Sequence, residues 1–121
     1  MPMREHLGEF EQLLLFALLV VDEEGAYGIP IRRAIEQRTG RVVSAGAVYT
    51  ALERLARRGF VTSRFGEAVP ARGGRRKKYY ELTPAGALAL SRSYETLWRM
   101  ADGLRPKLAR LVEQEAGTQS P

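Results

Sequence analysis

The chain has 121 residues, of which 45% are hydrophobic and 27% are charged, so it can bury the core of one globular domain but not of two. It contains no cysteine, which excludes disulfides and thiolate metal sites, and its only histidine is His6 near the N-terminus. The sequence shows no metal-ligand cluster, no phosphate-cradling glycine motif and no nucleophile paired with a base. We therefore expect neither enzymatic activity nor a metal or cofactor.

The net charge of +5 is unevenly distributed along the chain. Residues 31–80 carry 13 Lys and Arg against 3 Asp and Glu, whereas the remainder carries 6 against 11. A positive field focused on one region favours a polyanion as the partner. The longest apolar run, Leu13–Val21, is about half as long as a membrane span, and residues 1–12 do not resemble a cleavable signal. We expect a cytoplasmic protein with no membrane partner.

The first two expected elements are helices. Apolar residues recur at helical spacing between residues 8 and 21, and the acidic run 22–25 ends this first helix. A second helix is expected to begin near Ile29–Pro30, because proline is tolerated in a first turn, and to end at Gly40.

A third helix is expected over residues 45–58, with Ser44 as its N-cap. Val48, Leu52 and Leu55 form its buried stripe at spacing i, i+4, i+7. Tyr49 lies at the border of that stripe. The far side of the helix carries small, polar and charged residues: Gly46, Thr50, Glu53, Arg54 and Arg57.

Two β-rich runs, 60–65 and 77–83, are joined by a polar loop that contains Pro70, and they predict a hairpin with a long tip. Five cations fall within seven residues around the pair Gly73–Gly74: Arg72, Arg75, Arg76, Lys77 and Lys78. A cationic, glycine-hinged loop on a rigid hairpin can reach a phosphate backbone. We expect a mainly α fold with a small β-hairpin, a winged helix-turn-helix over residues 8–83.

Thr83–Pro84 looks like the start of a long last helix over residues 84–115, whereas residues 1–7 and 116–121 are expected to be mobile ends. Apolar residues spaced 4, 3, 4, 3, 4, 3 predict a heptad seam for homodimerisation, formed by Leu90, Tyr94, Leu97, Ala101, Leu104, Leu108 and Leu111. The alternative is that this seam folds back on the first helix, and it can do both in part. Pro106, with Gly103 before it, is expected to bend or split the helix.

In a helix-turn-helix, the second helix of the pair places its N-terminal residues on base edges in the major groove, and the third helix has that position here. Its small opening turn, 44–47, lets the backbone approach a duplex, and its helix dipole favours a phosphate. We expect Thr50 and Arg54 nearest the base edges, and the other cations and hydroxyls mainly on phosphates. The expected DNA-binding residues are Ser44, Ala45, Gly46, Tyr49, Thr50, Arg54 and Arg57 in this helix, and Arg64, Arg72, Gly73, Gly74, Arg75, Arg76, Lys77 and Lys78 in the wing.

Two of these residues have plainer interpretations. Tyr49 can be a half-buried packing residue, and Ser44 can cap the helix without touching DNA.

Five stretches, in this order and spacing, resemble the PadR-like transcriptional regulators of bacteria: Tyr27–Ile31, Arg38–Gly40, Ser44–Leu55, Gly59–Val61 and Gly73–Gly86. The resemblance covers about residues 8 to 100. With its single C-terminal helix, the chain resembles the short-tailed branch of the family. It implies a winged helix-turn-helix, a C-terminal dimerisation helix, and repression from a palindromic operator that a small molecule often relieves. Many members have proline where this chain has Thr50, so the resemblance does not define the operator sequence.

Trp98 is the only tryptophan and lies beside the expected seam. In multidrug-responsive relatives an aromatic residue on this helix lines a pocket between subunits. The resemblance therefore implies that Trp98 and its dimer mate can stack on a flat apolar or aromatic effector, with Ala101 leaving room beside them. The alternative is that Trp98 simply packs against the first helix.

Two other functions remain open at this point. A winged-helix module can dock acidic proteins without reading DNA, but it does not need cations on both the third helix and the wing. Sequence-tolerant architectural binding is the other, and it predicts similar affinity for any duplex.

Overall fold

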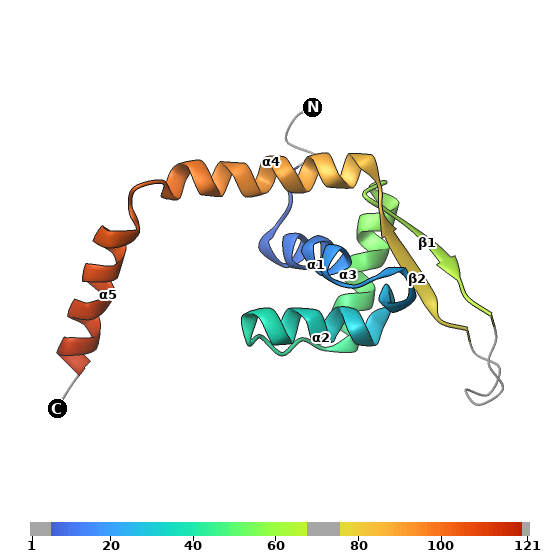
Figure 1. Cartoon of the computed structure of the whole chain (residues 1–121), viewed down its shortest axis with the longest axis horizontal. Coiled ribbons are helices and arrows are strands. Elements are labelled where there is room, and N and C mark those ends of the chain that lie inside the picture. The colour runs from blue at the N-terminus through green and yellow to red at the C-terminus, as the bar shows by residue number, and fades with distance from the viewer. Residues whose placement is uncertain (1–5, 68–75, 120–121) are drawn as a thin grey trace.

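The computed structural model describes residues 6–67 and 76–119 of the chain. Figure 1 shows a compact group of helices with a β-hairpin at one side, a long helix lying across the group, and a last helix that extends from its far end. Within the described ranges the elements are α1 Glu9–Val20, the 3-10 helix η2 Glu23–Gly25, α2 Gly28–Thr39, α3 Ala45–Arg57, β1 Val61–Phe65, β2 Lys78–Leu82, α4 Pro84–Ala101 and α5 Arg105–Gln119.

The core lies where α1 meets α2, α3 and α4. It is built from branched aliphatic side chains that are fully or almost fully buried, including Leu14, Leu15, Ile31, Leu52 and Leu55. Leu52 and Leu55 belong to the stripe that the helical spacing of the third helix predicts to be buried. The expected fold class, mainly α with a winged hairpin, is confirmed.

Helix ends follow the signals in the sequence. Ser44 Oγ accepts a hydrogen bond from the Ala47 amide at 3.0 Å, and Thr83 Oγ1 accepts one from the Gly86 amide at 3.0 Å, so both residues are N-caps. Gly40 ends α2 in the left-handed conformation, with φ of 75°, which a residue without Cβ adopts at little cost.

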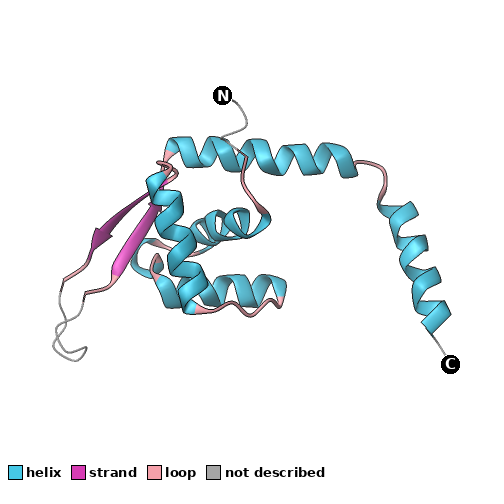
Figure 2. Ribbon diagram, turned by 180° about the vertical axis from the view of Figure 1, so that it is seen from behind, coloured by secondary structure: helices cyan, strands magenta, loops and turns pink. Residues whose placement is uncertain are grey.

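The hairpin pairs β1 and β2 in antiparallel register, from Val61 opposite Leu82 to Phe65 opposite Lys78. The Tyr80 amide also donates to the Ala26 carbonyl at 2.8 Å, which fixes the hairpin to the segment before α2. Figure 2, seen from behind, shows the strands extending beside α3 as a wing. The expected tip, including Pro70, lies outside the described residues.

The N-terminal boundary differs from the expectation that residues 1–7 are mobile. Leu7 is fully buried, its amide donates to Ser93 Oγ on α4 at 3.3 Å, and its carbonyl accepts from Gln12 at 3.0 Å. An apolar side chain that fills the gap between α1 and α4 gains more by burial than the ordering of its backbone costs. The packed domain therefore includes Leu7.

The C-terminal region is two helices, and the split expected from Gly103 and Pro106 is confirmed. Gly103 has φ of 76° and separates α4 from α5, while Pro106 falls in the first turn of α5, where its missing N–H does no harm. A single helix over 84–115 is therefore corrected to two, and α5 runs on to Gln119 rather than fraying after residue 115.

None of the helices in the described part of the chain is long and apolar enough to cross a membrane.

Candidate nucleic-acid interface

The exposed side of α3 carries one line of residues that lies opposite its buried stripe. Gly46, Thr50 and Arg57 are exposed and share this side, because spacings of four and seven residues return to the same face of a helix. Val48, Ala51, Leu52 and Leu55 are buried against the core. The helix therefore presents a small residue, a hydroxyl and a guanidinium to a partner along one line.

A groove of about 610 Å³ runs beside the start of α3. Its walls come from three elements: Tyr27, Gly28 and Ile29 at the start of α2, Ala45, Gly46, Val48, Tyr49 and Leu52 of α3, and Arg76, Lys77, Lys78 and Tyr80 of the wing. Two helix N-termini and three cations thus border the same hollow. Both features attract anions, so the groove can hold a phosphate.

The start of α2 was not among the residues that sequence reasoning selected. Its N-cap is Tyr27, which makes no side-chain capping bond, so the first-turn amides of Gly28 and Ile29 are available to a ligand. Lys77 lies over the Tyr27 ring, with Nζ 4.2 Å from its centroid. The signal in the sequence was the absence of Ser, Thr, Asp or Asn at position 27, where a helix start normally has a cap.

The wing cations have different surroundings. Lys78 Nζ lies 2.8 Å from Glu53 Oε2, and the Arg64 guanidinium lies over the Tyr79 ring at 4.6 Å. Arg76 is exposed. The other residues expected at the tip, namely Arg72, Gly73, Gly74 and Arg75, lie outside the part of the chain that the structure describes.

Glu53 is the link between α3 and the wing. Its Oε2 accepts a hydrogen bond of 2.6 Å from the Tyr80 hydroxyl as well as the ion pair from Lys78. Hydrogen bonds from Lys78 and Tyr80 lower the pKa of Glu53, and the hydrogen bond to Glu53 raises the pKa of Lys78. Burial, followed by the adjacent carboxylate, raises the pKa of Tyr80 well above its ordinary value, so its hydroxyl stays a donor.

Arg54 is exposed, and its side chain is paired with α1. Its Nε is 3.7 Å from Glu11 Oε2 of α1, and Arg58 binds the same carboxylate at 3.3 Å. Glu11 lies in the first turn of α1. Arg57 is in line with Gly46 and Thr50, whereas Arg54 lies toward Glu11 and Arg58.

Ser44 caps α3 and Tyr49 packs beside the wing, and both side chains are also exposed to solvent. Ser44 caps α3 and remains exposed beside the small residues Ala45 and Gly46. Tyr49 is 49% exposed, and its ring centroid lies 5.8 Å from Lys78 Nζ. Tyr49 therefore borders the groove with its ring partly open to solvent.

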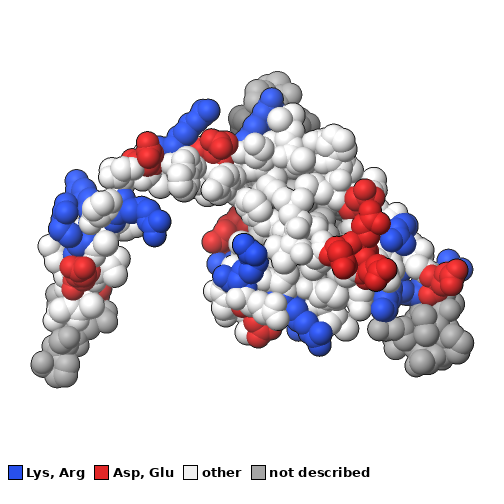
Figure 3. All heavy atoms as spheres, in the orientation of Figure 1, with Lys and Arg blue, Asp and Glu red and all other residues white. Residues whose placement is uncertain are grey.

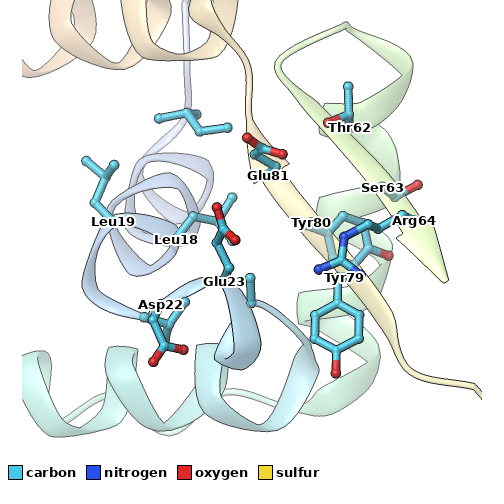
Figure 4. Close-up of a pocket in the computed structure, with 13 residues that line it drawn as sticks. Leu18, Leu19, Asp22, Glu23, Thr62, Ser63, Arg64, Tyr79, Tyr80 and Glu81 are labelled. Carbon is cyan, nitrogen blue, oxygen red and sulfur yellow. The ribbon is translucent and has the colours of Figure 1, made fainter. Parts of the chain in front are cut away.

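A second pocket, of about 410 Å³, lies on the other side of the hairpin, between α1, η2 and the strands. Figure 4 shows Asp22, Glu23 and Glu81 around it, and the space-filling view of the same side shows acidic side chains gathered over these elements. Carboxylates repel a polyanion, so this side is unsuited to DNA. α3 lies on the opposite side, in front in Figure 2.

The expected seam divides between the core and the surface. Leu90 is buried in the core of its own chain, and Tyr94 packs edge-on against Phe16 of α1 at 5.7 Å. Beyond that point the expected seam is exposed, at Leu97, Ala101, Leu104, Leu108 and Leu111. The seam thus partly folds back on the first helix and partly stays uncovered.

Trp98 lies largely at the surface. It is 58% exposed and stacks on Tyr94, with ring centroids 6.2 Å apart. Tyr94 in turn contacts Phe16, so three aromatic rings run from α1 along α4.

Comparisons with known proteins support the fold. The model of the transcriptional regulator PadR-like family matches residues 17–92. The chain is similar to the structure of a PadR family transcription regulator from Clostridium difficile, with 25% identity, a TM-score of 0.65, and coverage of 84% of this chain and 99% of that one. It is also similar to a transcriptional regulator from Clostridium thermocellum, with 26% identity, a TM-score of 0.63, and coverage of 80% and 86%.

A PadR family transcriptional regulator from Eggerthella lenta is a further similar structure, with 26% identity, a TM-score of 0.61, and coverage of 93% of this chain and 87% of that one. No curated protein matches the chain. The family model spans more than half of the sequence and includes all of α2, α3 and the wing strands. The chain therefore belongs to the PadR-like family of transcriptional regulators.

Proposed function

We propose that the protein is a homodimeric, sequence-specific DNA-binding regulator that represses transcription by occupying a palindromic operator. The observation that carries this proposal is the groove between α2, α3 and β2, where two helix N-termini and the wing cations Arg76 and Lys77 border one surface. Anion-binding groups from three separate elements meet there, as a curved phosphate backbone requires.

In this proposal α3 enters the major groove. Gly46 has nothing within 4 Å of the position where a Cβ would be, so the start of the helix can come close to the bases. Thr50 and Arg57 follow on the same side, and arginine is well suited to guanine because it donates two hydrogen bonds to that base edge. These two side chains are the proposed readers of sequence.

Contacts to phosphates hold α3 in position along the major groove. The amides of Gly28 and Ile29 at the start of α2 face one backbone, together with the hydroxyls of Ser44 and Tyr49. The wing cations other than Lys78 meet the backbone or the minor groove beside the site.

Dimerisation supplies the second half-site. The described part of α5 is exposed throughout, and it presents Leu108, Leu111 and Val112 to solvent, at 61%, 53% and 60% exposure. Apolar residues at this density on a helix that extends away from its own domain are best explained by a second copy (Figure 1). A two-fold dimer would present two copies of α3, and a palindromic site matches that symmetry.

A flat apolar or aromatic effector is the proposed signal. Trp98 is exposed, already stacked on Tyr94, and lies beside Leu97 on the proposed dimer surface. An aromatic ligand between two such tryptophans would alter how the two α4 helices meet, and with them the spacing of the α3 pair.

The test is a selection of preferred duplexes from a random pool, followed by salt-dependent affinities for the winner and for a scrambled duplex. A palindromic winner that binds at least about a thousandfold more tightly than the scrambled duplex supports the proposal. Equal and steeply salt-dependent binding to both duplexes contradicts it and indicates an architectural role. Absence of binding at low salt contradicts it as well and favours a protein-interaction module.

A further inference from the structure

A carboxylate lies in the middle of the surface that we propose for DNA. Glu53 is the only acidic residue of α3 and lies between Thr50 and Arg57 along the helix. An unpaired carboxylate at this position would repel phosphate. Its presence therefore requires a role that outweighs this repulsion.

The contacts of Glu53 define that role. Its Oε2 lies 2.8 Å from Lys78 Nζ and accepts a 2.6 Å hydrogen bond from Tyr80, and both partners belong to β2. The side chains of Lys78 and Glu53 are only 20% and 29% exposed, so water and salt screen the pair less than they screen a surface pair. Lys78 Nζ is also surrounded by rings, 5.4 Å from the centroid of Phe65 and 5.8 Å from that of Tyr49.

We propose that Glu53 is a positioning residue that holds the Lys78 ammonium away from phosphate and so limits the sequence-independent affinity of the wing. Phosphate contacts strengthen binding to every duplex alike, because they carry no sequence information. A chain with 13 Lys and Arg between residues 31 and 80 has ample positive charge for a backbone. The ion pair between Glu53 and Lys78 fixes the wing against α3. Because the pair neutralises the charge of Lys78, this cation does not add to binding at random sites.

This inference rests on the proposed DNA-binding function. It predicts that removal of the negative charge of Glu53 increases the affinity for DNA. E53Q keeps a carbonyl oxygen for the Tyr80 hydroxyl but removes the charge that holds Lys78. We expect the released ammonium to contact one more phosphate, so that log K against log salt becomes steeper by about 0.9 for a random duplex. The affinity at about 0.1 M salt should rise three- to tenfold for random and preferred duplexes alike.

Two further variants isolate the pair. K78M in the parent should leave the salt slope unchanged, because Lys78 is already compensated, whereas K78M added to E53Q should abolish the gain. E81Q is the matched control, since it removes one carboxylate from the same hairpin on the side that borders the acidic pocket. We expect no change in slope from E81Q.

Each contrary result has a distinct meaning. If K78M in the parent loses about one unit of slope and E53Q gains none, Lys78 leaves Glu53 on binding and the inference is wrong. A changed sequence preference in E53Q at constant slope would overturn it too, because Glu53 would then contact a base. An equal gain from E81Q would show a general charge effect, which also contradicts a role for the pair.

The outcomes also separate this inference from the function on which it rests. If the parent protein binds no duplex at low salt, both the proposed DNA-binding function and the role of Glu53 are wrong. A parent that binds, with an E53Q variant of unchanged affinity and slope, removes the role of Glu53 alone. If E53Q fails to fold, as judged by circular dichroism, K78M in the parent decides the question: an unchanged slope supports the inference and a loss of about one contradicts it.

Discussion

Two glycines show how the same residue type serves packing at one position and the proposed recognition at another. Gly86 is buried at the start of α4, and a Cβ there would fall on the Phe60 carbonyl oxygen and within 2.9 Å of Leu82 Cδ1. Gly46 has open space at the same position. Only Gly86 is required by the fold, so Gly46 is free to serve the approach of α3 to DNA.

Substitution by alanine should separate these two roles. G46A is expected to keep or raise the free energy of unfolding by up to about 1 kcal/mol, since alanine favours a helix more than glycine does. The same change should weaken binding to the preferred duplex about tenfold, because the new methyl group holds the helix back from the bases. G86A should instead destabilise the fold by about 1–3 kcal/mol or more, as overpacking does. Denaturant unfolding and duplex titration of both variants would check this, and a G46A protein with parental DNA affinity would contradict it.

Arg57 and Arg54 provide a second contrast at the residue scale. R57A should cost about 1–3 kcal/mol of binding to the preferred duplex and relax the preference at one base position. R54A should change DNA affinity by less than about threefold and stability by no more than about 1 kcal/mol, since its ion pair with Glu11 is partly exposed. Parallel titrations and repeated duplex selection would distinguish them. A larger loss of affinity in R54A than in R57A would contradict this and would support the expectation from the sequence that Arg54 lies near base edges.

At the scale of elements, Glu53 joins α3 to β2 through its contacts with Lys78 and Tyr80. The lowered pKa of Glu53 means that its ionised form is favoured by folding. The stability that it contributes is therefore present above the ordinary carboxyl pKa and is lost as pH falls through the lower pKa of the folded state.

This linkage predicts a pH dependence for the difference between two proteins. E53Q should unfold more easily than the parent at neutral pH, and the gap in unfolding free energy should narrow below about pH 4.3, where a carboxyl group of the unfolded chain becomes protonated. Urea unfolding of both proteins between neutral and acidic pH measures the gap, and other carboxyl groups cancel in the comparison. In a K78M background the gap should shrink. A gap that widened as pH fell would contradict the assignment of the pair.

Local signals predicted most of these elements. Ser44, Thr83 and Gly40 act within one helical turn, so the ends of α2, α3 and α4 could be read from their own neighbourhoods. The placements that the sequence did not reveal depend on contacts between distant residues. Arg54 is drawn to Glu11, Lys78 to Glu53, and Leu7 to the gap beside Ser93, and no local pattern encodes such pairs. The uncapped start of α2 also has a local signal, but that signal is the absence of a capping residue type at Tyr27.

At the scale of the whole molecule, the surfaces are segregated by chemistry. Anion-binding groups gather around the start of α3, the acidic pocket occupies the other side of the hairpin, and apolar side chains line the outer half of α4 and α5. The sequence anticipated this division, since its basic middle and its C-terminal heptad spacing are separate along the chain. It left open how the seam divides: Leu90 belongs to the core, whereas Leu97 and the later seam residues stay exposed.

We predict that the exposed apolar side chains of α5 form a dimer interface, and that acidic substitutions there dissociate the dimer. L108E combined with L111E is expected to convert a species of twice 13.5 kDa into one of 13.5 kDa, with helical content retained. Affinity for a palindromic duplex should then fall about a hundredfold or more, because two linked half-sites no longer bind together. L88E is the control, as Leu88 is 46% exposed on α4 away from the seam. Sedimentation equilibrium measures the mass, and a double variant that remains dimeric would contradict the proposed role of α5.

The central claim is that the starts of α2 and α3, together with the wing, form the surface that meets DNA. The most direct measurement is the change in backbone amide NMR shifts when the selected duplex is added to the intact chain. We predict large shifts at Gly28, Gly46, Thr50 and Lys77, and small ones at Glu23 and Glu81 around the acidic pocket. Large shifts confined to the acidic side, with α3 unaffected, would contradict it.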